Sequence, residues 1–446
     1  MRSPAPARVG YATPLANSEF RGLTLAQVIS ECGDQVARIA LAVLVFNQLH
    51  SAFYTALTYA VGYLPLVVGG TLLSPLVDWL PRRRLMLVCH AARAVLVALI
   101  ALPGVPIAVA LVLLAGVSLF EAPFSAARAS IIPDLLPDGP TYAAAVSLGR
   151  ALNQVDQAIG FFLGGLVLAF VHPRGALLID SLGFVVAYLV VLVTVRPRPG
   201  AAAGRVHRLW GDLRTGLSTT FGPSARRALV LIVWLYGLCL ILPEGVAVTY
   251  AHSRGGGAIS AGVLTAAPAA GLFVGAVALT RWVPARRQTE LMQVLGFGAC
   301  ATLVLTALRP PVAVTAILWF ASGVFQAYWI PAVATFNVSV ESELRGRAIA
   351  IAGAGLSLMQ GIALAAGGAL AVAVGPTAAV AWFALAGLVG LTLLNAWWPR
   401  AELAALADEA FGPLARPDAE LAYGTLDPSA VDVPGLDVAE GVGRPD

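Results

Sequence analysis

The sequence predicts an all-α membrane protein whose twelve transmembrane helices form two pseudo-symmetric six-helix halves. Three features predict this fold: the composition, the length of the apolar runs and an internal repeat. Of the 446 residues, 59% are hydrophobic and 12% are charged, and the mean hydropathy is +0.82. Soluble domains carry about 25% charged residues, so this chain has too few charged residues to cover a water-exposed surface.

Twelve apolar runs are long enough to cross a bilayer as helices. A hydrocarbon core about 30 Å thick requires about 20 apolar residues in helical conformation. Strands of a membrane barrel are about ten residues long and alternate in polarity, and these runs do neither. In order, the runs are 22–49, 53–77, 85–103, 105–127, 142–171, 175–195, 228–250, 257–280, 289–307, 311–337, 347–374 and 376–398.

The placement of the arginines predicts the orientation of the chain. Cytoplasmic loops of membrane proteins are enriched in positive charge. With the N-terminus inside, 22 of the 28 basic residues, all of them arginine, fall on the inner side, whereas Arg174, Arg254 and Arg309 fall outside. We therefore expect a multi-pass protein of a cell inner membrane with both termini in the cytoplasm. Because the first run contains charged residues, unlike a signal peptide, we expect it to remain as a helix.

Residue types exclude several classes of function. The chain has no lysine, whereas a P-loop needs its Lys to reach nucleotide phosphates and a Schiff base needs a Lys amine. The four cysteines stand alone without a CxxC pair, so we expect no disulfide framework and no metal. HExxH and GxSxG signatures are absent from the sequence, and we expect neither an enzyme nor a bound cofactor. The pI of about 9.0 reflects the arginine loops rather than nucleic-acid binding.

The C-terminal segment 399–446 differs from the rest of the chain. Residues 400–446 hold three arginines and ten acids. They are also rich in Pro and Gly, a composition typical of disorder. We predict an acidic, disordered cytoplasmic tail; the alternative for its first part, AELAALADEAF, is a short interfacial helix.

An internal repeat divides the chain into two. Seven identities share one offset of 203 residues: Trp79, Pro81, Arg83, Arg84, Gln157, Gly164 and Gly165 match Trp282, Pro284, Arg286, Arg287, Gln360, Gly367 and Gly368. We predict duplicated halves at 22–195 and 228–398. A cytoplasmic N-terminal segment, 1–21, precedes them, and a central cytoplasmic loop, 196–227, joins them.

The repeated halves predict a transporter. Many transporters bind substrate near the membrane midplane between two repeats and rock one half against the other to alternate access. Arginine-rich loops at the inner ends would then close an inner gate by pairing with helix ends and acids. The arginines predicted to form this gate are Arg82, Arg83, Arg84, Arg286, Arg287 and Arg347.

A polar stripe in the first run predicts coupling to protons. Gln27, Glu31, Asp34 and Arg38 are spaced 4, 3 and 4 residues apart, which places them within roughly 60° of one helix face. Such a stripe should face a water-filled cavity, because ionisable residues inside a membrane are costly. Glu31 and Asp34 would repel each other if both were ionised, so one is expected to hold a proton. The alternative is a structural Asp34–Arg38 pair beside a neutral, buried Glu31.

Six motifs carry a family resemblance. They are SECGD in the first run, SPLVDWLPRRR after the second, ASIIPDLLP after the fourth, GFFLGG in the fifth, LLIDSLGF in the sixth and LRGRA before the eleventh. With twelve runs and a long central loop, the chain resembles the major facilitator superfamily. Within it, the chain resembles the drug/proton antiporter branch that contains macrolide-efflux and enterobactin-export proteins. The resemblance adds Ser74 and Asp78, in the motif after the second run, to the predicted gate. The chain departs from the family pattern at Ser74 and Trp79, where Gly and Arg are usual, and at Phe161, where Pro is common.

The resemblance implies that the first, fourth, seventh and tenth runs line a central cavity, and it places Glu31, Glu121 and Glu244 there. The full set of proton-coupling candidates is Glu31, Asp34, Arg38, Glu121, Asp156 and Glu244. The substrate-cavity candidates are Gln27, Phe120, Trp234, Gln326 and Trp329. For the aromatic residues, the alternative is an interface belt or helix packing.

The resemblance also implies that the fifth and eighth runs meet across the two halves. Small residues spaced four apart let helices approach closely, so we expect Gly160 and Gly164 to face Gly271 and Gly275. Asp180 and Arg93 match the branch's pattern, and we expect them to be structural.

These observations predict a secondary active transporter that exports a small amphipathic organic molecule in exchange for protons. We expect it to function as a monomer in the lipid bilayer, without nucleic acid. Three carboxylates in the cavity would favour cationic or hydrogen-bonding substrates. The alternatives are a proton symporter that imports a nutrient and a membrane sensor that transports nothing.

Overall fold

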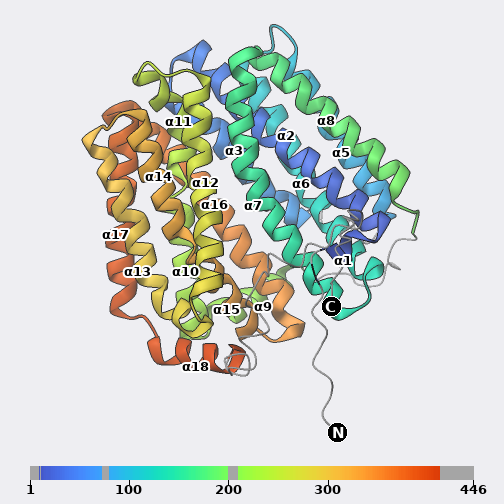
Figure 1. Cartoon of the computed structure of the whole chain (residues 1–446), viewed down its shortest axis with the longest axis vertical. Helices are drawn as coiled ribbons and strands as arrows, with labels where there is room; N and C mark the ends of the chain where they lie inside the picture. Colours follow the sequence, from blue (N-terminus) through green and yellow to red (C-terminus); the bar gives the residue numbers. More distant parts are fainter. Residues whose placement is uncertain (1–9, 11, 73–79, 199–208, 412–446) are drawn as a thin grey trace, which may run out of the picture.

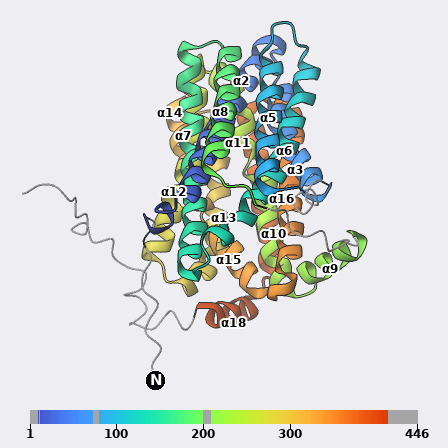
Figure 2. The ribbon, with the colours of Figure 1, turned by 90° about the vertical axis from the view of Figure 1, so that its right-hand side faces the viewer.

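The computed structural model describes residues 10, 12–72, 80–198 and 209–411, and every regular element in these ranges is helical. The long helices lie side by side in one bundle (Figures 1 and 2). Three short helices, α1 (Ala12–Leu15), α9 (Leu209–Phe221) and α18 (Arg400–Phe411), lie at one end of it. We call this the terminal end, and the opposite end the far end.

Six long helices form the N-terminal half. They are α2 (Ser18–Leu49), α3 (Ala52–Leu72), α5 (Arg82–Ala101), α6 (Ile107–Leu135), α7 (Gly139–Phe170) and α8 (Pro173–Thr194). Local sequence sets their starts: the side chain of Asn17 accepts hydrogen bonds from the backbone N–H groups of Glu19 and Phe20, and Asp138 accepts one from Thr141. Asn and Asp are preferred at this position because they satisfy donors that the first helical turn leaves unpaired.

The C-terminal half contains two helices that are broken in mid-path. Its elements are α10 (Ser224–Cys239), α11 (Leu242–Ser253), α12 (Ala258–Trp282), α13 (Ala285–Val304) with a 3₁₀ turn (Leu305–Leu308), α14 (Val312–Gln326), α15 (Trp329–Ser339), α16 (Ser342–Val374) and α17 (Pro376–Ala396). In the sequence, Pro243 predicts a break in the seventh run, because proline disrupts a helix interior, and α10 and α11 are indeed separated just before this residue. The break before α15 was not predicted, and Pro331 follows it.

Ten helical segments in the described part of the chain are long and apolar enough to cross a membrane, with α10–α11 and α14–α15 each counting as one. The all-α, multi-pass prediction is therefore confirmed. The other two predicted spans correspond to α2, which carries the polar stripe, and to α3, which ends where residues 73–79 begin. For these two, crossing the membrane remains a prediction.

The two halves meet in a matched way. The most extensive contacts between them are α3 with α16 and α7 with α12, which are equivalent pairs if the halves are repeats. Gly164 packs on α2 of its own half, whereas Gly165 meets Gly262 of α12 across the interface. The repeat partners behave alike: Gly367 packs on Leu242 of its own half, and Gly368 meets Ala56 of α3. A duplication explains this correspondence, although the limits of the halves remain predictions.

Two segments are more ordered than the sequence suggested. Part of the central loop forms α9, which packs on α16. Residues Arg400–Phe411, which we predicted as the start of a disordered tail, instead form α18. Its apolar face buries Leu403 and Ala407 against the bundle, and the carboxylate of Glu402 accepts hydrogen bonds from Ser224 and from the backbone N–H of Ala225. The alternative of a short helix was therefore correct for this segment, because its alanines and leucines form an apolar face, whereas its place at a membrane interface remains a prediction.

Candidate functional site

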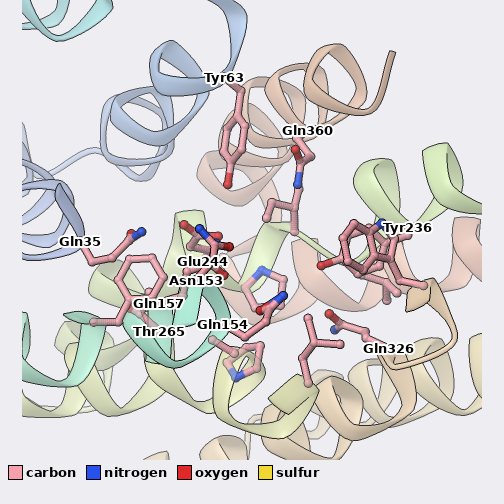
Figure 3. A pocket seen from close by; sticks show the side chains of 18 of the residues that line it. Gln35, Tyr63, Asn153, Gln154, Gln157, Tyr236, Glu244, Thr265, Gln326 and Gln360 are labelled. Carbon is pink, nitrogen blue, oxygen red and sulfur yellow. The ribbon is translucent and has the colours of Figure 1, made fainter. Parts of the chain in front are cut away.

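A cavity of about 280 Å³ lies between the two halves at mid-height of the bundle (Figure 3). It is lined by α2, α3, α7, α10, α11, α12, α14, α15 and α16. Its polar lining residues are Gln35, Arg38, Tyr63, Asn153, Gln154, Gln157, Tyr236, Glu244, Thr265, Gln326, Trp329 and Gln360. Both halves therefore contribute hydrogen-bonding groups to one site.

The cavity wall is rich in uncharged hydrogen-bonding groups. Six side-chain amides line it, together with one cation, Arg38, and one acid, Glu244. Three buried polar atoms have no partner among the described residues: the amide oxygens of Gln35 and Gln154 and the indole nitrogen of Trp329. A buried polar group without a partner costs free energy, so a ligand that supplies these hydrogen bonds would be stabilised here.

The internal repeat reaches into this cavity. Gln157 and Gln360, which match at the repeat offset, both line it, one from α7 and the other from α16. Figure 3 shows their side chains entering the same space from opposite halves. The seventh-run acid, Glu244, lies in the first turn of α11, directly after the break that follows α10. The helix break thus places the carboxylate at mid-height of the cavity.

Of the five predicted substrate-cavity residues, the structure brings two into the cavity. Gln326 and Trp329 line it, and the amide N–H of Gln326 donates to the hydroxyl of Ser322 at 3.2 Å. Gln27, Phe120 and Trp234 do not line it. Phe120 packs in an apolar cluster within the N-terminal half, and the indole of Trp234 donates to the carbonyl oxygen of Ala352 at 2.9 Å.

We predicted that the polar stripe of the first run faces one cavity. In the structure, its residues along α2 instead have different surroundings. Arg38 lines the central cavity, and its guanidinium lies 5.8 Å from the centre of the Tyr63 ring. Asp34 instead lines a smaller cavity inside the N-terminal half and forms an ion pair with Arg93 at 2.6 Å. The predicted structural pair of Asp34 with Arg38 is therefore wrong: among the described residues Arg38 has no carboxylate within 4.0 Å.

Glu31 is held by two side-chain amides, one helical turn before Gln35 on α2. Gln27 donates to one carboxylate oxygen at 2.7 Å, and Asn153 of α7 donates to the other at 3.0 Å. Asp156 lies on the same α2–α7 contact, where the thiol of Cys32 approaches its carboxylate at 3.7 Å. Neither acid lines the central cavity. Glu121 lines the smaller cavity. Of the three acids expected in the central cavity, Glu31, Glu121 and Glu244, the described structure therefore places only Glu244 there.

Three of the six described gate arginines, Arg82, Arg83 and Arg286, form pairs that do not cross between the two halves. Arg82 donates to Asp134 at the end of α6, and Arg83 donates to the carbonyl oxygen of Leu192 in the last turn of α8. Arg286 lies 3.5 Å from Asp408 of α18. Pairing with acids and helix ends was predicted, but these pairs do not join the two halves. Arg84, Arg287 and Arg347 are exposed at the same end, and Ser74 and Asp78 lie outside the described residues.

A further ion pair at the terminal end was not predicted. Arg198, in the connection after α8, donates to Glu19 at the start of α2 at 2.8 Å, and the backbone N–H of Arg196 donates to the same carboxylate. Burial opposes the ionisation of Glu19, but these hydrogen bonds and the positive charges outweigh it and lower the pKa of this carboxyl below its usual value. The pair ties the end of the sixth helix to the start of the first.

The four predicted interface glycines pack within the halves rather than between them. A Cβ on Gly160 or Gly164 would collide with α2, at 2.9 Å from Gln35 or 3.1 Å from Val36. A Cβ on Gly271 or Gly275 would lie 2.0 or 2.2 Å from backbone oxygens of α14. Spacing shows that a glycine face exists but not which neighbour it meets. Gly165 and Gly262 form the contact between the halves instead.

Sequence reasoning also missed Tyr63 and Tyr236, which enter the cavity from α3 and α10. Each run also holds other hydroxyl side chains, such as Tyr59 and Thr249, so no signal in the sequence singled these two tyrosines out. The amides of α7 had a visible signal, because Asn153, Gln154 and Gln157 recur on one face of the fifth run.

A polar cavity between two packed halves of a multi-helix membrane bundle defines the class as a membrane transporter. The sequence profile of the Major Facilitator Superfamily matches residues 23–317. The chain therefore belongs to that superfamily of transporters, as its motifs indicated, and is not an enzyme.

Relatives and solved structures agree with this assignment. The chain is 24% identical over 350 residues to the multidrug efflux pump Tap of Mycolicibacterium fortuitum, covering 74% of this chain and 84% of that protein. It matches the nucleoside transporter NupG with a TM-score of 0.68 at 14% identity, covering 85% of this chain and 100% of that one. It matches a bacterial homologue of the human lysosomal transporter Spinster, in an inward-facing and unoccupied conformation, with a TM-score of 0.64 at 14% identity, covering 88% and 98%. At such identities the solved structures show the shared fold alone.

Proposed function

We propose that this transporter exports a small amphipathic organic molecule by alternating access and that protons moving inward drive the export. The observation that carries the proposal is Glu244, the one acid in a cavity lined by both halves. The similarity to a multidrug efflux pump supports the direction and the type of substrate. We further propose that the protein lies in a cell inner membrane and functions as a monomer, because one chain supplies the whole cavity.

Arg38 and Glu244 give the proposed exchange a simple charge basis. When Glu244 is ionised, the two lining charges cancel, and the amides can bind a neutral or singly cationic molecule. When Glu244 takes up a proton, Arg38 remains as the only charged lining group, and a cationic substrate is repelled. Proton binding and substrate binding are then opposed at one site, so that proton uptake favours substrate release. With one acid rather than three, substrates of high positive charge are disfavoured.

The closed side of the cavity supports an inward-facing arrangement. Gly165 meets Gly262, and Phe46 meets His252 with ring centres 4.9 Å apart, both across the halves and both near the far end. Our orientation places the termini, and with them the terminal end, in the cytoplasm. The far end is then the outer side, and substrate would enter the cavity from the cytoplasmic side.

Transport into everted membrane vesicles tests the proposal. With an acid interior, we expect accumulation of at least one of ethidium, tetraphenylphosphonium and erythromycin, and its loss on adding a protonophore. Glu244→Gln keeps the size of the side chain and removes the charge, so it should abolish the accumulation. Glu290→Gln, an exposed glutamate of the same half, is the matched control and should transport normally.

Two results would count against the proposal, one against its direction and one against the role of Glu244. Accumulation only in right-side-out vesicles with an acid exterior would indicate the importing symporter. Gradient-driven accumulation that persists in Glu244→Gln would show that this acid does not couple transport to protons.

A further inference from the structure

A second cavity lies wholly inside the N-terminal half and contains charges that the central cavity does not use. It has a volume of about 30 Å³, enough for water but not for an organic substrate. Five ionisable residues line it, from four helices: Asp34, Arg38, Arg93, Glu121 and Asp180. Three acids thus face two arginines in a space closed to substrate.

Asp180 of α8 has no partner in this cluster. The residue is 1% exposed, and both oxygens of its carboxylate lack a hydrogen-bond partner among the described residues. Arg93 is committed to Asp34 through one terminal nitrogen at 2.6 Å. An ionised carboxylate that is buried and unpaired carries a desolvation penalty of several kcal/mol, and such groups become neutral instead. The geometry thus requires a proton on Asp180.

An alternative partner for Asp180 is already present in the same cavity. The Nε atom of Arg93 is buried and has no acceptor among the described residues. Its guanidinium lies 4.4 Å from the centre of the Phe184 ring, one helical turn beyond Asp180 on α8. Arg93 therefore has an unused donor, and Asp180 has unused acceptors.

Gly33 creates the space that Asp180 occupies. A Cβ at position 33 would lie 2.3 Å from an oxygen of the Asp180 carboxyl, so any other residue would push this side chain away. Gly33 directly precedes Asp34 on α2. The two motifs SECGD and LLIDSLGF thus meet here, one supplying the acid bound to Arg93 and the other supplying the unpaired acid.

We propose that Asp180 is a proton-binding residue and that Asp34 and Asp180 alternate as the ion-pair partner of Arg93. When the proton moves from Asp180 to Asp34, Asp180 becomes the carboxylate that Arg93 binds, and the net charge of the cluster is unchanged. This deepens the proposed function, on which it rests, by adding a second proton site to Glu244. Arg38 lines both cavities and connects the two.

The surroundings of Asp180 favour a proton over a metal ion. The charged and titratable groups around it are Asp34 and Arg38 of α2, Tyr59 of α3, Arg93 and His90 of α5, and Glu121 of α6. His90 is fully buried, and its ring lies against Phe124 and Phe184. No three acidic, histidine or cysteine residues in the described ranges are placed to hold a metal ion.

Infrared spectroscopy of the purified protein in lipid nanodiscs tests this proton directly and without a substrate. At neutral pH, the difference spectrum of wild type minus Asp180→Asn should show the loss of one protonated-carboxyl band. Loss of an ionised-carboxylate band instead would overturn the proposal. Because neither result depends on transport, the outcome is separate from that of the export experiment.

A pair of glycine variants provides a second test in which both acids are retained. Gly33→Ala should shift the Asp180 carboxyl band and abolish gradient-driven accumulation in vesicles. Gly183→Ala is the matched control on the same α2–α8 contact, because its Cβ would lie 3.8 Å from Ile29, an ordinary contact distance. It should leave both the band and the accumulation unchanged. An unshifted band in Gly33→Ala, or equal effects of the two variants, would contradict a role for Asp180.

Discussion

The contact between Gly165 and Gly262 offers a way to shift the transporter from one conformation to another. A Cβ on Gly165 would lie 2.6 Å from the Cα atom of Gly262 and 2.8 Å from the carbonyl oxygen of Ala258. Both are backbone atoms that cannot rotate away, so Gly165→Ala should force the far ends of α7 and α12 apart. In a transporter that rocks one half against the other, this change disfavours the conformation described here relative to its opposite.

The size of the shift follows from the cost of overpacking. Inserting a methyl group into a closely packed contact costs about 1–3 kcal/mol, which changes an equilibrium between two conformations by about 5- to 150-fold. Gly353→Ala is the control, since nothing lies within 4 Å of the added Cβ. Both variants replace a helical glycine with alanine, so they share the change in helix propensity.

Electron–electron distance measurements between spin labels would detect the shift. With the native cysteines replaced, labels at Ala143→Cys and Arg281→Cys, both exposed near the terminal ends of α7 and α12, report the opening at that end. Gly165→Ala should add or enlarge a population with a shorter distance, whereas Gly353→Ala should match the parent. An unchanged distribution in Gly165→Ala would refute the reasoning that this contact holds the far end closed.

Three further predictions concern stability, measured by thermal unfolding in detergent. Trp234→Phe removes a hydrogen bond to Ala352 and should lower the free energy of unfolding by about 1 kcal/mol. Transport should persist because Trp234 does not line the cavity. A large loss of substrate affinity would contradict this position of Trp234. Glu402→Gln weakens the cap on α10 and should lower the free energy of unfolding by about 1 kcal/mol. Arg286→Gln, in an exposed pair, should leave the stability unchanged. The opposite order of the two effects would be inconsistent with α18 capping α10. Because the pKa of Glu19 is lowered, its ionised form stabilises the fold above the usual pKa of glutamate, and this contribution disappears as pH falls through the lowered value. Glu19→Gln should therefore be less stable than wild type at neutral pH and equally stable in strong acid, and a difference independent of pH would argue against the ion pair.

The repeat was the most informative feature of the sequence about the fold and the site. Identical residues at a constant offset keep the same helix face, so Gly165 and Gly368 both meet the opposite half, and Gln157 and Gln360 both line the cavity. Such a pattern survives because the two halves face each other across one interface. The break at Pro243 was also predictable, since proline acts locally.

Partners of individual polar residues could not be predicted from one helix at a time. Asp34 and Arg38 share a face of α2, yet successive turns of this helix meet different neighbours, so Asp34 reaches Arg93 and Arg38 reaches the central cavity. The glycine pairs failed for the same reason, because spacing defines a face and tertiary packing selects what covers it. The amide-rich wall joins three amides of α7 to single amides of α2, α14 and α16, and no local pattern shows that these four helices meet at one cavity.

Proton movement during transport tests the central claim most directly. The purified protein would be reconstituted in liposomes that contain a trapped pH-sensitive dye, and ethidium, tetraphenylphosphonium and erythromycin would be added outside in turn. Proton-coupled exchange predicts that entry of a transported compound makes the lumen more alkaline, and that Glu244→Gln abolishes this change while Glu290→Gln preserves it. Entry of a compound with no change in pH, or with acidification of the lumen, would contradict proton-driven export.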